Sequence, residues 1–288
     1  MTEMEKLRIA IQKSGRLSEK SMELITEAGI KLSNGNRKLI APSYNFPVEL
    51  LYLRDDDIPQ SVEDGVADIG IVGLNEVEEK NKNVSIMEGL GFSKCRLSLA
   101  IPKSTDYQGL EFFNNKIIAT SYPVILGRFL KEKNIKAEIH EISGSVEIAP
   151  GIGMADAIFD IVSSGSTLIS NGLKEVEVVL KSEAVIISKK ELSEDKTKIL
   201  NELLFRFHAV QNARKNKYIL LNAPNDRLDE ICGVLPGMKS PTIMSLAEKG
   251  WSSVHSVISE DDFWEVIGKL KERGAQGILV IPIEKMIV

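Results

Sequence analysis

In the first two thirds of the chain, short apolar segments alternate with amphipathic helical ones, and this alternation limits the fold more than any other feature. Apolar runs typical of strands lie at 7–11, 48–53, 67–72, 96–101, 116–119, 138–142, 156–162 and 177–187. Helical spacing of apolar residues occurs at 17–28, 124–133 and 196–215, and a short helix is expected at 145–153. Strands that alternate with helices indicate α/β layers with largely parallel sheets. Turns rich in Gly and Ser follow several strands, at the ends where open α/β sheets hold ligands.

The pattern changes after the long helix. Strands are expected at 218–222, 242–247, 252–258 and 277–281, with helices at 226–234 and 261–273. The order βαββαβ is that of the ferredoxin-like fold. At 288 residues the chain also exceeds the usual size of one domain. We therefore expect a separate small domain from about Asn216 onward.

Composition narrows the class of protein. The net charge of −5 argues against a protein that coats nucleic acid, and no run is apolar enough to span a membrane. The first residues carry Glu3, Lys6 and Arg8, which do not fit a signal peptide. Cys95 and Cys232 lie far apart and fit no metal or disulfide spacing. These features predict a cytoplasmic protein without nucleic-acid or membrane partners.

A strand followed by a loop of small residues is the most informative local motif. The apolar run that carries Asp156 and Asp160 leads into Ser163-Ser164-Gly165-Ser166-Thr167. Small side chains leave backbone N–H groups bare, and a helix start adds about half a unit of positive charge, so this loop suits a phosphate. Carboxylates repel phosphate but accept hydrogen bonds from hydroxyls, so the motif predicts a ribose 5-phosphate. The alternative is a plain βα turn with a capping Ser or Thr, which leaves both carboxylates without a partner.

Three other segments are weaker candidates. The loop Lys13-Ser14-Gly15-Arg16 follows the first expected strand and offers two cations beside a flexible glycine. The acidic run Arg54–Pro59 is also typical of a solvated, capped turn. Asp68 and Gly70 lie in a run that ends at Gly73, where a ligand could approach the backbone.

The three histidines, His140, His208 and His255, have no spacing suited to a metal site or a catalytic triad, and we interpret them as structural or surface residues. Because no Ser/His or Cys/His pair is visible, the reaction should need little proton transfer. Transfer of a ribosyl group from an activated diphosphate fits that limit, since the enzyme mainly positions its substrates and stabilises charge.

A long, gapped set of residues around the small-residue loop matches a family signature at every spacing. The set is Glu147, Gly153, Ala155, Ile158, Asp160, Ile161, Ser164-Gly165 and Thr167-Leu168. In these residues the chain resembles the ATP phosphoribosyltransferases. The resemblance continues through Gln12–Leu17, Arg54–Pro59, Ala119–Pro123, Ser240–Thr242 and Leu279–Lys285. It covers essentially the whole chain, and the C-terminal domain makes the chain similar to the long form of the family.

The resemblance implies the first committed step of histidine biosynthesis. In that reaction N1 of the adenine of ATP attacks C1 of phosphoribosyl pyrophosphate (PRPP), giving N1-phosphoribosyl-ATP and pyrophosphate, with Mg²⁺ required. A ring nitrogen already carries its lone pair, which agrees with the missing general base. The implied catalytic region, 1–215, has two lobes of periplasmic-binding-protein-like (type II) fold with the site between them. Lobe I covers about 1–98 and 182–215, lobe II about 99–181, and a ferredoxin-like regulatory domain 216–288.

The family's site residues are carried over to the matching positions. The implied catalytic residues are Asp160, Glu147 and Arg16. The implied PRPP ligands are Asp156, Asp160, Ser163, Ser164, Gly165, Ser166 and Thr167. The implied ATP ligands are Lys13, Gly15, Arg16, Asp68, Gly70 and Tyr122. Glu147 would lie near the ribose or the metal, and the protein ligands of Mg²⁺ are left unassigned.

The resemblance also implies feedback inhibition by histidine, bound to the C-terminal domain. The residues expected at that pocket are Asn222, Met238, Thr242, Ser252 and Gly277. Some relatives carry an acidic residue at the position of Asn222, which would neutralise the ligand's amino group. The family usually forms hexamers built from dimers, so a homo-oligomer is expected.

Two other functions are compatible with parts of the pattern. A solute-binding or sensor protein could share the two-lobed fold without any chemistry, because fold alone does not fix function. A phosphoribosyltransferase that acts on a free base could share the phosphate loop. The run from Asp160 to Thr167 argues against the first alternative, and only the choice of acceptor distinguishes the second.

Overall fold

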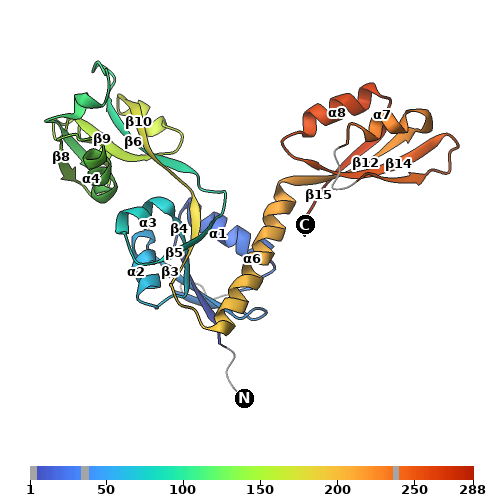
Figure 1. The fold of residues 1–288 in the computed structure, drawn as a ribbon, viewed down its shortest axis with the longest axis horizontal. Coiled ribbons are helices and arrows are strands. Elements are labelled where there is room, and N and C mark those ends of the chain that lie inside the picture. The colour runs from blue at the N-terminus through green and yellow to red at the C-terminus, as the bar shows by residue number, and fades with distance from the viewer. Residues whose placement is uncertain (1–4, 34–38, 236–239) are drawn as a thin grey trace. The chain divides into compact units, whose positions relative to one another are not determined.

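The computed structural model describes residues 5–33, 39–235 and 240–288 (Figure 1). Contacts between Cα atoms divide the chain into two compact units. The first comprises Met1–Glu23 and Lys31–Thr197, and the second comprises Leu24–Ile30 and Lys198–Val288. Within the described residues, the first unit holds two β-sheets and the second holds one.

The first sheet is built around strands that are buried on both faces. Its strand order is β2-β3-β1-β4-β11-β5. The strands are β1 (Leu7–Gln12), β2 (Ile40–Pro42), β3 (Val48–Leu53), β4 (Ile69–Gly73), β5 (Ser85–Gly89) and β11 (Ala184–Ser188). In β1, Ile9, Ala10 and Ile11 are fully buried, as is typical of an inner parallel strand. The helical segments of this part are α1 (Arg16–Glu27), the 3-10 turn η1 (Asp55–Asp57), α2 (Ile58–Glu63) and α3 (Leu74–Lys80).

The second sheet has the order β10-β6-β9-β7-β8. Its strands are β6 (Cys95–Pro102), β7 (Ile117–Thr120), β8 (Glu138–Glu141), β9 (Ala157–Val162) and β10 (Leu173–Ser182). The helical segments are η2 (Leu110–Phe113), α4 (Pro123–Glu132), η3 (Val146–Ile148) and α5 (Ser166–Ser170). Phe113 and Phe159 anchor the apolar core on one face, and Ile158, Val162 and Leu168 belong to the core on the other.

Both sheets follow the same plan. In the order β3-β1-β4-β11-β5, a strand from late in the chain is inserted antiparallel beside β4. In the order β8-β7-β9-β6-β10, β6 is inserted antiparallel beside β9 in the same way. Two sheets of this plan, joined where β5 leads into β6 and β10 into β11, form the expected two-lobed, periplasmic-binding-protein-like architecture. That fold-class prediction is confirmed.

Two expectations about this region were wrong. The segment 177–187 is not one strand, because β10 ends at Ser182 in the second sheet and β11 begins at Ala184 in the first. The sheets are also mixed rather than largely parallel. Among the described residues, four of their strand pairs are parallel and five are antiparallel. The inserted strands β6 and β11 each pair antiparallel on both sides, and the short strand β2 pairs antiparallel with β3, which accounts for all five antiparallel pairs.

The second unit contains the long helix α6, which starts at Glu194 in the first unit and ends at Arg214, and a four-stranded sheet. The remaining elements are β12 (Asn216–Pro224), the 3-10 turn η4 (Asn225–Arg227), α7 (Leu228–Cys232), β13 (Thr242–Ser245), β14 (Trp251–Ser259), α8 (Phe263–Glu272) and β15 (Gln276–Pro282). The order β13-β14-β12-β15 with antiparallel neighbours is the ferredoxin-like arrangement that the sequence predicted. Ile219 and Leu221 of β12 alternate into a core shared with Leu270 of α8.

Across the described ranges, no helix has both the length and the apolar character needed to cross a membrane.

Candidate active site

The loops that follow β1 and β3 meet at one edge of the first sheet. Because β1 pairs in parallel with both β3 and β4, their carboxyl ends lie together. The backbone N–H of Lys13 donates to the carbonyl of Leu53 at 2.8 Å, and the Gln12 amide donates to Asp55 at 3.4 Å. The predicted loop Lys13–Arg16 and the acidic run at η1 are therefore neighbours.

The Lys13–Arg16 loop is open to solvent. Lys13, Gly15 and Arg16 are all exposed. Gly15 has φ +98°, a conformation that side chains rarely tolerate, so the tight turn into α1 depends on glycine here. Two flexible cations beside a turn of this kind can reach phosphate groups that approach the sheet edge.

Asp68 and Gly70 lie elsewhere and have structural roles. Asp68 precedes β4, is 1% exposed, and accepts hydrogen bonds from the backbone N–H of Arg8 and from Lys196 at 2.9 and 3.0 Å. These bonds and the nearby lysines lower its pKa, against the effect of burial. A Cβ at Gly70 would stand 2.6 Å from Cγ2 of Ile58, so glycine lets α2 pack on the sheet. This placement speaks against contact of either residue with ATP.

The small-residue loop Ser163–Thr167 follows β9 at the carboxyl end of the second sheet's parallel strands. Gly165 has φ +82° and starts α5, and the hydroxyls of Ser164 and Ser166 lie 2.9 Å apart. Within the described part of the chain, the backbone N–H groups of Ser164 and Gly165 face no protein acceptor. All five residues are exposed or half-buried. The loop thus presents bare amides and hydroxyls, as an anion-binding turn does.

Asp160 lies in β9, three residues before Ser163, and its carboxylate interacts electrostatically with that of Glu147. Burial, and next the negative charge of Glu147 in η3, raise the pKa of Asp160 to about 6, although its bond from the N–H of Ile161 at 2.7 Å opposes the rise. Glu147 is half-buried. A carboxylate that is desolvated and close to a second acid, yet unpaired with a cation, is typical of a functional site.

Asp156 does not share this environment. It precedes β9, and the six residues of that strand put it about 20 Å from the loop. Its carboxylate accepts the backbone N–H of Ile117 at 2.9 Å and pairs with Lys116 at 3.3 Å, and these contacts lower its pKa. The carboxylate of Asp156 is thus neutralised by a protein cation, Lys116, which argues against a contact of Asp156 with ribose.

Tyr122 links the two sheets. Its side chain is 9% exposed, and its hydroxyl donates to Glu76 at 3.1 Å and accepts from the Asn75 amide at 3.4 Å. Burial, followed by the charges of Glu76 and Asp160, raises the pKa of Tyr122 far above its ordinary value. Burial and the charge of Asp55 raise the pKa of Glu76 as well. The carboxyl ends of the two sheets therefore meet around a cluster of acids.

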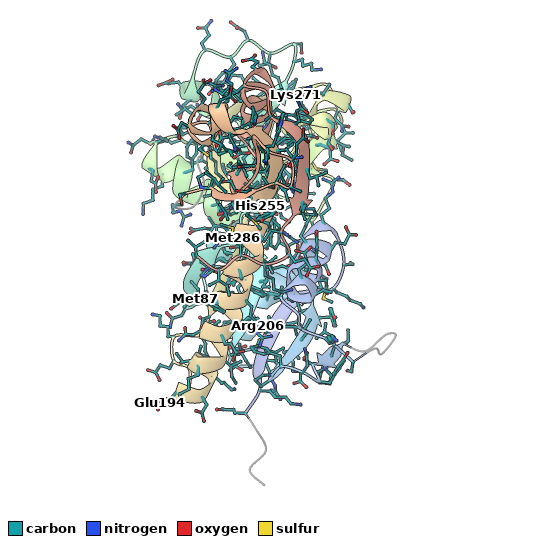
Figure 2. The ribbon with its side chains drawn as sticks, turned by 90° about the vertical axis from the view of Figure 1, so that its right-hand side faces the viewer. Met87, Glu194, Arg206, His255, Lys271 and Met286 are labelled. Atoms are coloured by element: carbon teal, nitrogen blue, oxygen red, sulfur yellow. The ribbon has the colours of Figure 1, made fainter. Side chains whose placement is uncertain are left out.

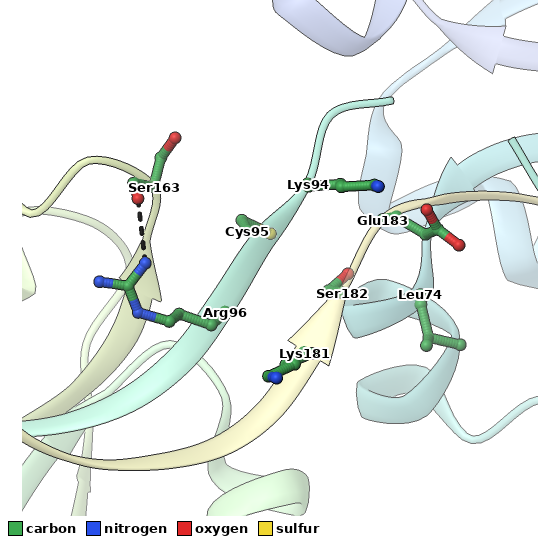
Figure 3. A pocket seen from close by; sticks show the side chains of 8 residues that line it. All are labelled: Leu74, Lys94, Cys95, Arg96, Ser163, Lys181, Ser182 and Glu183. Atoms are coloured by element: carbon green, nitrogen blue, oxygen red, sulfur yellow. Dashed lines mark hydrogen bonds between the residues drawn. The ribbon is translucent and has the colours of Figure 1, made fainter. Parts of the chain in front are cut away.

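Several of these groups were not predicted from the sequence. Asn75 and Glu76 lie in the first turn of α3, which begins immediately after the strand that ends at Gly73, and this position could have identified them. Arg96 stands near the start of the apolar strand β6 and donates to the carbonyl of Ser163 at 3.1 Å. It lines a cavity of about 580 Å³, shown in Figure 3. The other lining residues are Leu74, Lys94, Cys95, Ser163, Lys181, Ser182 and Glu183.

In the second unit, the structure brings only part of the expected histidine pocket together. The Asn222 amide lies beside Gly277, 3.2 Å from where a Cβ would stand. Thr242 is exposed on β13, which pairs with β14 and not with β12. Ser252 is buried on the face of the sheet opposite to Asn222, and its hydroxyl donates a hydrogen bond to the Asn225 side chain at 2.7 Å. Met238 lies outside the described residues.

His255, labelled in Figure 2, has both ring nitrogens engaged. Its Nδ1 is 2.7 Å from the hydroxyl of Tyr218, and its Nε2 is 3.0 Å from that of Ser253. These contacts fit a structural histidine on the sheet.

Comparison with protein families decides which class of site this is. A profile described as ATP phosphoribosyltransferase matches residues 54–209, and one described as the HisG C-terminal domain matches residues 213–285. The chain belongs to the ATP phosphoribosyltransferase family. The second match marks it as the long form, as the sequence predicted. Membership makes the chain a pentosyltransferase and excludes the solute-binding interpretation.

Individual relatives agree over the full length. The chain is 64% identical to the ATP phosphoribosyltransferase of Bacteroides thetaiotaomicron over 282 residues, which are 98% of this chain and 100% of the relative. It is 65% identical, with the same coverage, to that of Parabacteroides distasonis. Among solved structures, a chain of the ATP phosphoribosyl transferase (HisG:HisZ) complex from Thermotoga maritima is similar. Its TM-score is 0.60 at 27% identity, and the match covers 70% of this chain and 98% of that one.

Proposed function

We propose that the two-lobed unit transfers the 5-phosphoribosyl group of PRPP to N1 of ATP, releasing pyrophosphate, as the first step of histidine biosynthesis. The observation that carries the proposal is the bare-amide loop Ser163–Thr167 beside the half-buried, unpaired Asp160. Catalysis is assigned to residues 1–215 and regulation to 216–288.

The loop holds the 5-phosphate of PRPP. The N–H groups of Ser164 and Gly165 and the exposed hydroxyls of Ser163, Ser166 and Thr167 are the donors available to it. Such donors are fixed before the substrate arrives, so little reorganisation is needed on binding.

Asp160 holds the ribose. As a carboxylate it accepts hydrogen bonds from the 2- and 3-hydroxyls, and its charge favours the positive character that C1 gains as pyrophosphate departs. Because the pKa of Asp160 is about 6, the proton must leave before the carboxylate can act. Glu147 reinforces the negative field on the same side of the sugar.

The acceptor needs no general base, since adenine N1 attacks with its own lone pair. Lys13 and Arg16, on the exposed loop after β1, attract the pyrophosphate or the phosphates of ATP. Tyr122 sets the back of the nucleotide site, with its hydroxyl held by Glu76. The contribution of these groups is positioning, which brings N1 in line with C1.

Mg²⁺ belongs to the proposal because the family reaction requires it. Across the described residues, no cluster of three or more His, Cys, Asp or Glu side chains suits a metal. Mg²⁺ commonly uses one or two carboxylates together with substrate phosphates and water. Glu147, with Asp160 nearby, fits that role, and the ion would neutralise the diphosphate of PRPP.

The second unit binds histidine, with Asn222 and Gly277 as the most closely juxtaposed residues of the expected pocket. A coupling free energy of about 1–3 kcal/mol between the two sites is enough for feedback inhibition. Assembly into dimers and hexamers, and a cytoplasmic location, complete the proposal.

The test is to mix the protein, ATP, PRPP and Mg²⁺ and to follow the near-ultraviolet band of N1-phosphoribosyl-ATP. Product formation is expected with ATP and not with adenine or orotate as the acceptor. If a free base reacts and ATP does not, the chain transfers phosphoribose to another acceptor. Asp160→Ala should reduce turnover far more than ATP affinity, and an unchanged rate would contradict the ribose role.

A further inference from the structure

An ion pair on the second sheet lies directly beside the proposed phosphate loop. Arg96 of β6 and Glu175 of β10 make a two-point contact, with Nε to Oε1 at 2.5 Å and Nη2 to Oε2 at 2.6 Å. The planar guanidinium matches a carboxylate in this fork geometry, which fixes its orientation as well as its position.

Glu175 is itself held in place. The hydroxyl of Ser98, which is 1% exposed, donates to Glu175 Oε1 at 2.7 Å. Ser98 and Arg96 are two residues apart on β6, so they lie on the same face of the sheet. Their cross-strand partners on β9 are Asp160 and Val162. The ion pair is thus anchored next to the strand that carries Asp160 into the loop.

The remaining nitrogen of Arg96 reaches the loop. Its Nη1 donates to the carbonyl of Ser163 at 3.1 Å, and Figure 3 shows this bond. Ser163 is the first residue after β9, so fixing its carbonyl fixes the peptide plane that carries the N–H of Ser164. That N–H is one of the bare amides proposed to receive the 5-phosphate.

We infer that Arg96 is a positioning residue for PRPP, which holds the phosphate loop in its binding conformation through the Ser163 carbonyl while Glu175 holds Arg96. This inference rests on the proposed function of the loop. Arg96 need not touch the phosphate, because its three nitrogens already contact protein acceptors. Lysine at this position would retain the charge but would lack the fork that contacts Glu175 and Ser163 together.

The neighbouring Lys181 provides a matched control. It lines the same cavity and stands opposite Arg96 in the β6–β10 register. No bond joins its side chain to the loop within the described structure, and it is exposed. Lys181→Gln therefore removes the same charge from the same surroundings without removing the contact to Ser163.

The experiment compares the steady-state kinetics of Arg96→Gln, Arg96→Lys, Glu175→Gln and Lys181→Gln with those of the unaltered protein. Arg96→Gln should raise KM for PRPP about tenfold or more while KM for ATP changes less than about twofold. Arg96→Lys should recover part of the loss. Glu175→Gln should act in the same direction, and the Arg96→Gln/Glu175→Gln double variant should be no worse than Arg96→Gln, since the two residues act as a unit.

Three results would overturn the inference. They are an unchanged KM for PRPP in Arg96→Gln, equal rises in both KM values, or a rise in Lys181→Gln as large as that in Arg96→Gln. A purely structural role of Arg96 would lower the melting temperature without separating the two KM values. If the unaltered protein forms no product from ATP and PRPP, the proposed function fails instead, and direct calorimetric titration with PRPP then tests Arg96 separately.

Discussion

Replacing Asp160 by Asn should make the protein more stable while it removes activity. Asparagine can still accept the N–H of Ile161, which Asp160 accepts at 2.7 Å, but it carries no charge to be desolvated. The pKa of Asp160 is raised from 3.8 to about 6 by burial and by Glu147. At about 1.36 kcal/mol per pH unit, the ionised form costs the folded state up to ~3 kcal/mol at pH 7.5.

The sign and the pH range of this effect follow from linkage. Because the folded-state pKa lies above the unfolded-state value, the cost is absent well below pH 4, grows between about pH 4 and pH 6, and is complete above that range. The stabilisation in Asp160→Asn should therefore fall to about half of its full value at pH 5. Urea unfolding of both proteins, followed by circular dichroism at pH 7.5 and pH 5, measures the difference. Product formation at pH 7.5 should be lost in the same variant.

The control for this experiment lies at the other end of the same strand. Asp156 pairs with Lys116 and has a lowered pKa, so Asp156→Asn should destabilise the protein at pH 7.5 and less so as the pH falls. Product formation should persist in that variant. Should Asp160→Asn be less stable than the unaltered protein, or more stable by the same amount at both pH values, the desolvation argument is wrong.

Other substitutions test the structural roles assigned above. Gly70→Ala should lower the free energy of unfolding by about 1–3 kcal/mol, because the new methyl group would stand 2.6 Å from Ile58. KM for ATP should stay unchanged. A large rise in that KM would indicate that Gly70 does lie at the nucleotide site. Asp68→Asn should lower the free energy of unfolding by about 3 kcal/mol at pH 7.5, since it leaves Lys196 without its buried partner. The loss should shrink as the pH falls through the lowered pKa of Asp68. Unfolding at several pH values measures both effects. Asn222→Asp should tighten histidine binding in a calorimetric titration, because a carboxylate attracts the ligand's ammonium group, and no change would place the amino acid elsewhere.

The sequence predicted the fold well wherever local pattern determines it. The C-terminal βαββαβ order is visible in the sequence because each strand and helix there has a clear spacing of apolar residues and is bounded by a turn. Segment 177–187 was predicted as one strand because β10 and β11 follow one another with only Glu183 between them. Only the pairing of Val185 with β4 and β5 places β11 in the other sheet. Inserted strands of this kind depend on contacts between distant residues, so a local pattern does not reveal them.

The candidate site was predictable in part for the same reason. The loop Ser163–Thr167 follows from composition and position alone. Asp156, Asp160 and Asp68 look alike in sequence, as carboxylates in or beside apolar strands. Their partners come from elsewhere in the chain: Lys196, for example, lies 128 residues from Asp68. Which acid is neutralised and which is left free for a ligand is therefore a property of the tertiary structure.

The placement of β11 has a consequence for how the chain reaches its native state. Within the described residues, β5 pairs only with β11, and β11 follows β5 by almost a hundred positions in sequence. The whole second sheet, from Cys95 to Ser182, lies between them as one uninterrupted stretch. On the ribosome that stretch can complete its hydrogen bonding first, whereas β5 waits as an unpaired edge until Ala184–Ser188 emerge. The lobe that is synthesised later can thus complete its sheet before the lobe that is synthesised first.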